Sequence, residues 1–143
     1  MPAQNEIQEM ERSYLVFISH AGSDTWVARK IARAIEGYGA RTFLDEAHIA
    51  VGEDFEERIL DALDQADELL VYFTPWSLKR PYVWTEIGAA WGKRMPIIGV
   101  LHGLTPEELN SQAGIPNLIK RRNMIDINKL EEYLLQLGIR ANK

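Results

Sequence analysis

Three short apolar runs constrain the fold of this chain more strongly than any other feature. Residues 14–18, 68–73 and 96–101 are nearly continuous apolar stretches rich in residues that favour β-structure. Such runs are typical of strands that are buried on both faces of a parallel sheet. Shorter runs at 41–44 and 124–127 predict two more strands. The sequence therefore predicts a five-stranded parallel sheet.

Helical patterns fill the intervals between these strands. Ser23 or Asp24 can cap the first helix, which Gly37 ends. The apolar spacing predicts further helices from Glu53, over 82–91 to near Gly92, from 105 onward over a short stretch, and over 129–137. Large apolar residues on the helical stripes, including Trp26, Leu60 and Trp91, are expected to pack in the core.

Alternating strands and helices with short links indicate an α/β fold with helices on both faces of the sheet. We expect a flavodoxin-like three-layer sandwich with strand order 2-1-3-4-5. Residues 1–12 read as a polar leader and residues 13–143 as a single domain. Ligands of such sheets bind at the carboxyl ends of the strands, where the winding reverses. The segments expected at that edge are 19–24, 45–52 and 74–82.

The composition of the chain argues against several classes of function. The chain has 143 residues, 46% of them hydrophobic, and a net charge of -5, which argues against general binding to nucleic acid or anionic membranes. The basic cluster 120–122 is more typical of a loop cap than of a nucleic-acid reader. We expect no disulfide, because cysteine is absent, and no metal site, because His20, His48 and His102 lie in separate segments. With no signal-peptide or membrane-spanning run, a soluble cytoplasmic protein is expected.

The helix over 82–91 contains one carboxylate among apolar residues. Glu86 lies four residues after Tyr82, so the two share a helix face beside the stripe formed by Val83, Ile87 and Ala90. A carboxylate is costly to bury among apolar neighbours, which suggests a function. A surface glutamate on a half-buried helix is the plainer interpretation. Because Glu86 lies on the second turn, its side chain leans toward the helix start and can reach the crevice.

The residues at the ends of the first and third predicted strands exclude several common kinds of binding or phosphorylation site. The turn over 19–24 has one glycine, so it is neither a dinucleotide fingerprint nor a phosphate-binding loop. Thr74 stands where a phosphoacceptor aspartate would end the third strand. Trp76 and Tyr82 could equally stack on a flat ligand ring or cover the end of the sheet.

Three segments in order resemble the conserved boxes of Toll/interleukin-1 receptor (TIR) domains of the small bacterial kind. Residues 17–24 resemble the first box, 43–53 the second strand and the BB loop, and 82–90 the glutamate-bearing third box. The resemblance is close over 14–101 and looser beyond. Tyr82 stands where the family commonly has tryptophan, which keeps an aromatic face.

Family members that retain this glutamate are NAD glycohydrolases, so the resemblance implies cleavage of the nicotinamide–ribose bond with Glu86 as the catalytic residue. NAD is then the substrate and no cofactor is needed. The product is ADP-ribose, a cyclic ADP-ribose isomer, or both, in bacterial immune signalling or defence. Expected partners are further copies of the domain, bound through the BB loop, and an effector protein that responds to the nucleotide product. The resemblance implies that substrate contacts come from Phe17, Ser19, His20, Asp24, Asp45, Ile49, Trp76 and Tyr82.

Two other functions stay open at the level of sequence. Many TIR domains are scaffolds that act through homotypic contacts, in which case Ile49 and Val51 of the BB loop would carry the interface. A nucleoside deoxyribosyltransferase-like enzyme also has an α/β fold and cleaves an N-glycosidic bond with a glutamate. It would act on free nucleosides rather than on a dinucleotide.

Overall fold

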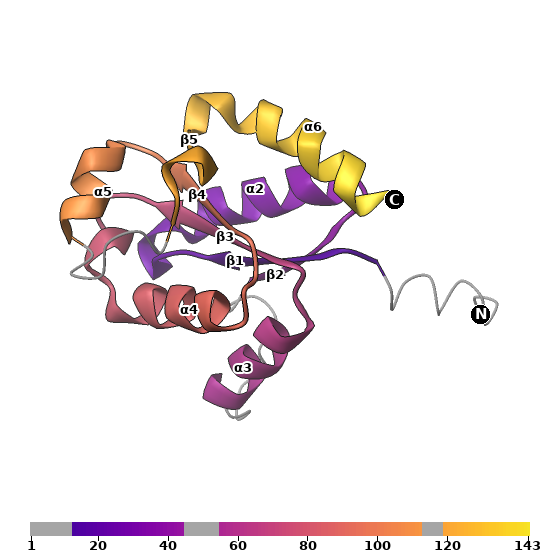
Figure 1. The fold of residues 1–143 in the computed structure, drawn as a ribbon, viewed down its shortest axis with the longest axis horizontal. Helices are drawn as coiled ribbons and strands as arrows, with labels where there is room; N and C mark the ends of the chain where they lie inside the picture. Colours follow the sequence, from indigo (N-terminus) through magenta and orange to yellow (C-terminus); the bar gives the residue numbers. More distant parts are fainter. Residues whose placement is uncertain (1–12, 45–54, 113–118) are drawn as a thin grey trace.

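The computed structural model contains a five-stranded, all-parallel sheet in the order β2-β1-β3-β4-β5 (Figure 1). The structure describes residues 13–44, 55–112 and 119–143. The strands are β1 (Leu15–Ser19), β2 (Arg41–Leu44), β3 (Glu68–Phe73), β4 (Ile97–Leu101) and β5 (Met124–Asp126). The predicted fold class and strand order are confirmed.

Helices cover both faces of the sheet, α2 and α6 on one and α3 and α4 on the other (Figure 1). Strand residues alternate between two apolar cores, so Phe17 and Val71 face α4, whereas Val16 and Leu70 face α2. The helices are α2 (Thr25–Gly37), α3 (Phe55–Gln65), α4 (Pro81–Gly92), α5 (Pro106–Gln112) and α6 (Leu130–Ala141). None of them, within the described part of the chain, has the length and apolar composition needed to cross a membrane.

The expected core positions of three large apolar residues are wrong. Trp26, Leu60 and Trp91 are 69%, 56% and 59% exposed. For Trp26 the reason is angular, because each helical residue turns the chain by about 100°. Trp26 is two residues from buried Ala28 and so lies on nearly the opposite face of α2, where Lys30 covers its ring. Trp91 lies in the last turn of α4, four residues after buried Ile87, so its angular position does not account for its exposure.

A buried carboxylate fixes α6 to the amino edge of the sheet. Glu68 begins β3 and is fully buried. Tyr14 and Tyr133 donate hydrogen bonds to its two oxygens, and Arg140 donates from 3.0 and 3.2 Å. Burial raises the pKa of the Tyr133 phenol, and the negative charge of Glu68 adds to that rise. This cluster joins residues more than fifty positions apart and stabilises the packing of α6.

Candidate active site

Glu86 is buried at the second turn of α4. Pro81 opens this helix, where its missing N–H costs no helical hydrogen bond. Val83, Ile87 and Ala90 form the buried stripe that the sequence predicted, and Glu86 is itself only 2% exposed. The alternative of a surface glutamate is therefore wrong. A carboxylate in such a position requires polar partners to offset its lost hydration.

Ser19 provides one such partner from the end of β1. Its Oγ donates a hydrogen bond of 2.6 Å to Glu86 Oε1, and the serine is completely buried. Side chains alternate along β1, so Ser19 faces the α4 side together with Phe17. The bond joins residues 67 positions apart and fixes the Glu86 carboxylate at the carboxyl edge of the sheet. The sequence placed both residues at this edge but did not predict their bond.

A second set of hydrogen bonds fixes the loop between β3 and α4. Thr74 Oγ1 donates to Asp24 Oδ2 at 2.6 Å, and the backbone N–H of Thr74 donates to Ser77 Oγ at 2.8 Å. Asp24 is the N-cap residue of α2, but its side chain makes no capping hydrogen bond, so the predicted side-chain cap is wrong. The competing tertiary bond to Thr74 explains this. The hydrogen bond between Thr74 and Ser77 could have been predicted from their Thr-x-x-Ser spacing.

His20 and Tyr72 lie close to this edge as well. His20 is buried, with its Nε2 at 3.3 Å from the Thr25 hydroxyl. Tyr72 is buried on the α2 side of β3, and its hydroxyl lies 2.6 Å from His102 Nδ1. Burial raises the pKa of Tyr72, and the nearby charge of Asp24 raises it further. The Tyr72–His102 pair was not predicted, because the two residues are thirty positions apart.

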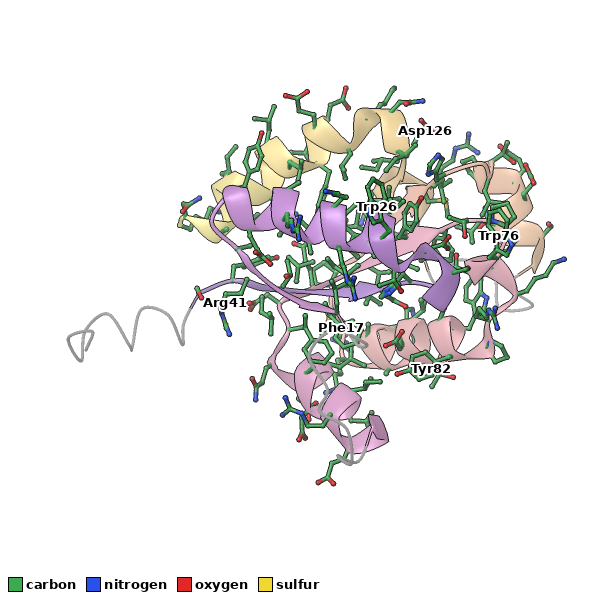
Figure 2. All side chains as sticks on the ribbon, turned by 180° about the vertical axis from the view of Figure 1, so that it is seen from behind. Phe17, Trp26, Arg41, Trp76, Tyr82 and Asp126 are labelled. Carbon is green, nitrogen blue, oxygen red and sulfur yellow. The ribbon has the colours of Figure 1, made fainter. Side chains whose placement is uncertain are left out.

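The three aromatic residues predicted to line the site occupy different surroundings. Phe17 is fully buried and its ring centroid lies 5.1 Å from that of Phe43. Tyr82 is half-buried against the same core, whereas Trp76 is 60% exposed. Figure 2 shows Trp76 well apart from Phe17 and Tyr82. The structure thus brings Ser19 to Glu86 but does not gather these three rings into one wall.

Two predicted contact residues, Asp45 and Ile49, lie outside the described residues, as does Val51. Their roles in substrate binding or self-association stay predictions. Across the described ranges, no three histidine or acidic side chains gather in a way that could hold a metal ion.

Comparison with known families identifies the domain. The model of the TIR domain family matches residues 16–137, which is most of the sequence. The chain belongs to the TIR domain family. Among solved structures, the TIR domain of the Toll-related receptor TRR-2 from Hydra magnipapillata is similar, with a TM-score of 0.64 and 20% identity. The similarity covers 87% of this TIR domain and 94% of that chain, and it supports the fold.

Two curated relatives carry enzyme names. A probable 2' cyclic ADP-D-ribose synthase of Brachypodium distachyon, BdTIR, is 32% identical over 101 residues, 69% of this chain and 45% of its own length. The 2' cyclic ADP-D-ribose synthase BtTIR of Bacteroides thetaiotaomicron is 26% identical over 109 residues, 73% of this chain and 38% of its own. This TIR domain thus spans less than half the length of either relative.

Proposed function

We propose that this TIR domain cleaves the nicotinamide–ribose bond of NAD, with Glu86 as the catalytic residue. The observation that carries the proposal is a buried carboxylate held by Ser19 at the carboxyl edge of the sheet. Ligands of doubly wound sheets bind at this edge. The names of the two relatives, both cyclic ADP-ribose synthases, favour NAD over a free nucleoside.

The chemistry follows from the charge on Glu86. When the bond between the ribose carbon and the nicotinamide nitrogen breaks, its electron pair leaves with nicotinamide, which departs as a neutral molecule. The ribose gains oxocarbenium character, and a fixed carboxylate stabilises that positive charge strongly because a buried site has a low dielectric. The Ser19 hydroxyl positions Glu86 Oε1 without neutralising it.

A nucleophile then completes the reaction at the ribosyl carbon. Water attacks and loses a proton to give ADP-ribose, or a hydroxyl of the same molecule attacks and loses its proton to give a cyclic isomer. The names of the relatives favour the cyclic product. Phe17, Tyr82 and Trp76 are the proposed aromatic contacts with NAD, and His20 and Asp24 the proposed polar ones.

The proposed setting is a cytoplasmic signalling or defence system. Self-association of TIR domains through the BB loop would control turnover, and an effector protein would respond to the nucleotide product. Asp45 and Ile49 of that loop are proposed to help close the substrate site, and Ile49 and Val51 are proposed to contribute to the interface. An enzyme of this kind can also be a scaffold.

The test is incubation of concentrated protein with NAD, with nicotinamide release followed by chromatography. Glu86→Gln and Glu86→Ala are expected to fold and to lose turnover by about 100-fold or more, as is typical when a key electrostatic stabiliser is removed. Release at the wild-type rate by both variants would remove Glu86 from the mechanism. Faster cleavage of free deoxynucleosides than of NAD would support the deoxyribosyltransferase alternative instead.

A further inference from the structure

A cavity of about 640 Å³ lies where α4 ends and β4 begins, at the sheet edge opposite to Glu86. Its described lining includes the Trp91 ring and three basic side chains, Arg94, Lys120 and Arg122, which we call the basic triad. The described residues that line the cavity include no acidic side chain. A concentration of positive charge is unexpected in a domain whose net charge is -5.

The other basic residues of the same segments form ion pairs, and this distinguishes them from the basic triad. Lys93 pairs with Asp64, and Arg121 pairs with Glu107 at 2.7 Å. The basic triad makes no ion pair with any residue in the described ranges. The neighbouring carboxylates are therefore used by side chains outside the cavity, and the positive charge inside it is left for a ligand. The cluster 120–122 was expected to cap a loop, and only Arg121 is held to a neighbouring element in this way.

Trp91 gives the cavity a flat apolar surface. The other tryptophan of α4, Trp84, is packed, because its Nε1 donates to Leu78 O at 2.9 Å and its ring lies 5.7 Å from that of Phe73. Trp91 is 59% exposed and lies one turn before Arg94. An exposed indole beside cations is a suitable surface for stacking a nucleobase.

The backbone at Arg94 supports a role for its side chain. Arg94 has φ 57°, the one left-handed non-glycine residue in the described ranges. It follows the cap of α4, with Arg94 N–H donating to Trp91 O and Met95 N–H to Ala90 O, which is the Schellman pattern. Glycine is the preferred residue there because it has no side chain to strain. A strained residue whose side chain lines a cavity suggests a functional requirement.

We propose that this cavity binds a mononucleotide carrying two or more phosphate charges, with its base on Trp91 and its phosphates on the basic triad. The volume lies within the usual range of about 300–1,000 Å³ for small-molecule pockets. The overall negative charge of the domain disfavours a long polyanion, so a single nucleotide fits better than a nucleic acid strand. The proposal does not depend on cleavage of NAD by Glu86.

The test titrates the whole chain with ADP and, separately, with inorganic pyrophosphate, by calorimetry. Arg94→Ala and Arg122→Ala are each expected to weaken binding of both probes by about tenfold. Trp91→Ala is expected to weaken ADP by about tenfold and to leave pyrophosphate unchanged, because pyrophosphate has no base to stack. Arg121→Ala is the matched control and is expected to stay within about twofold of wild type for both probes.

A second variant separates binding from folding. Arg94→Gly removes the side chain but favours the left-handed turn, so it should raise the melting temperature while it weakens ADP binding. A residue with a purely structural role would not show that combination. Arg94→Lys keeps the charge and is expected to retain part of the affinity.

Several results would overturn the proposal. One is no ADP binding by wild type at about 1 mM ADP. A second is ADP binding that the Trp91 and basic-triad variants leave unchanged, which would put the ligand elsewhere, for example in the Glu86 crevice. A third is tighter binding of a single-stranded oligonucleotide than of ADP, lost in the same variants, which would assign the surface to nucleic acid.

Discussion

Two buried glutamates, Glu68 and Glu86, lie at opposite edges of the same sheet and are bound by different side chains. Glu68 is held by Arg140 and by the hydroxyls of Tyr14 and Tyr133. The guanidinium neutralises its charge, and the phenols satisfy its oxygens. Such a cluster offsets the cost of burying a carboxylate and fixes the elements that contribute to it.

Glu86 receives a hydrogen bond from a hydroxyl, Ser19 Oγ, which orients the carboxylate without cancelling its charge. It also lies where the carboxyl ends of the strands meet, whereas Glu68 lies at the amino ends. Burial alone therefore does not distinguish a structural carboxylate from a functional one. The edge of the sheet at which the carboxylate lies does, because ligands of doubly wound sheets bind at the carboxyl ends of the strands.

The comparison is tested most severely by Glu68→Gln. Removing one member of a buried ion pair costs about 3–5 kcal/mol, and the half-exposed Arg140 reduces this to about 2–3 kcal/mol through solvent screening. Denaturant unfolding measures the change. A variant as stable as wild type would show that the Glu68 cluster does not stabilise the packing of α6.

The free energy of unfolding at high pH should also depend on the Glu68 cluster. Burial raises the pKa of Tyr133 above its usual 10.0, and the charge of Glu68 adds to the rise. The native state then keeps a proton that the unfolded chain loses. This contribution is complete below about pH 10, and above it Tyr133 lowers the free energy of unfolding by up to about 1.4 kcal/mol per pH unit. Burial also raises the pKa of Tyr14, which adds a second contribution of the same sign. Tyr133→Phe should reduce the slope of that fall in thermal melts between pH 9 and 11 and leave the Tyr14 contribution, and an unchanged slope would contradict the assignment.

Ser19→Ala tests whether the hydrogen bond to Glu86 contributes to catalysis. Loss of the hydrogen bond to Glu86 should slow NAD cleavage by about tenfold, because the carboxylate is less well oriented. This corresponds to an increase of about 1.4 kcal/mol in the activation free energy. Ser13→Ala, which removes an exposed hydroxyl bonded to Arg41, is the control and should leave the rate unchanged. A Ser19→Ala enzyme with the wild-type rate would show that Glu86 needs no positioning from β1.

The smallest expected effect is that of Glu86→Gln on stability. The amide keeps the size of the side chain and can accept the Ser19 hydrogen bond, so the free energy of unfolding should change by less than about 1 kcal/mol. The same unfolding measurement as for Glu68→Gln gives the matched comparison. A loss equal to that of Glu68→Gln would make both glutamates structural.

The sequence predicted the sheet, its strand order and the buried stripe beside Glu86, because these follow from local periodicity and from the topology of alternating elements. It could not predict contacts between distant segments. The Ser19–Glu86 bond and the Asp24–Thr74 bond depend on how two loops meet at the sheet edge. In the latter bond, the Asp24 side chain accepts from Thr74 instead of capping α2 as predicted.

Other failures had a local cause. Trp26 was assigned to the apolar stripe of α2, although it lies about 200° around the helix from buried Ala28. Glu68 began an otherwise apolar strand, and the pattern gave no indication of the partners that α6 would provide. Trp91 is the instructive case, because its exposure places an aromatic ring in a cationic cavity.

The most direct test of the central claim is the rate of nicotinamide release from NAD by Glu86→Gln and Glu68→Gln, each expressed per folded molecule. Glu86→Gln is expected to be slower than wild type by about 100-fold or more, while Glu68→Gln is expected to stay within about threefold. Glu86→Gln turning over as fast as Glu68→Gln would contradict the claim that the buried carboxylate at the carboxyl edge stabilises the ribosyl cation.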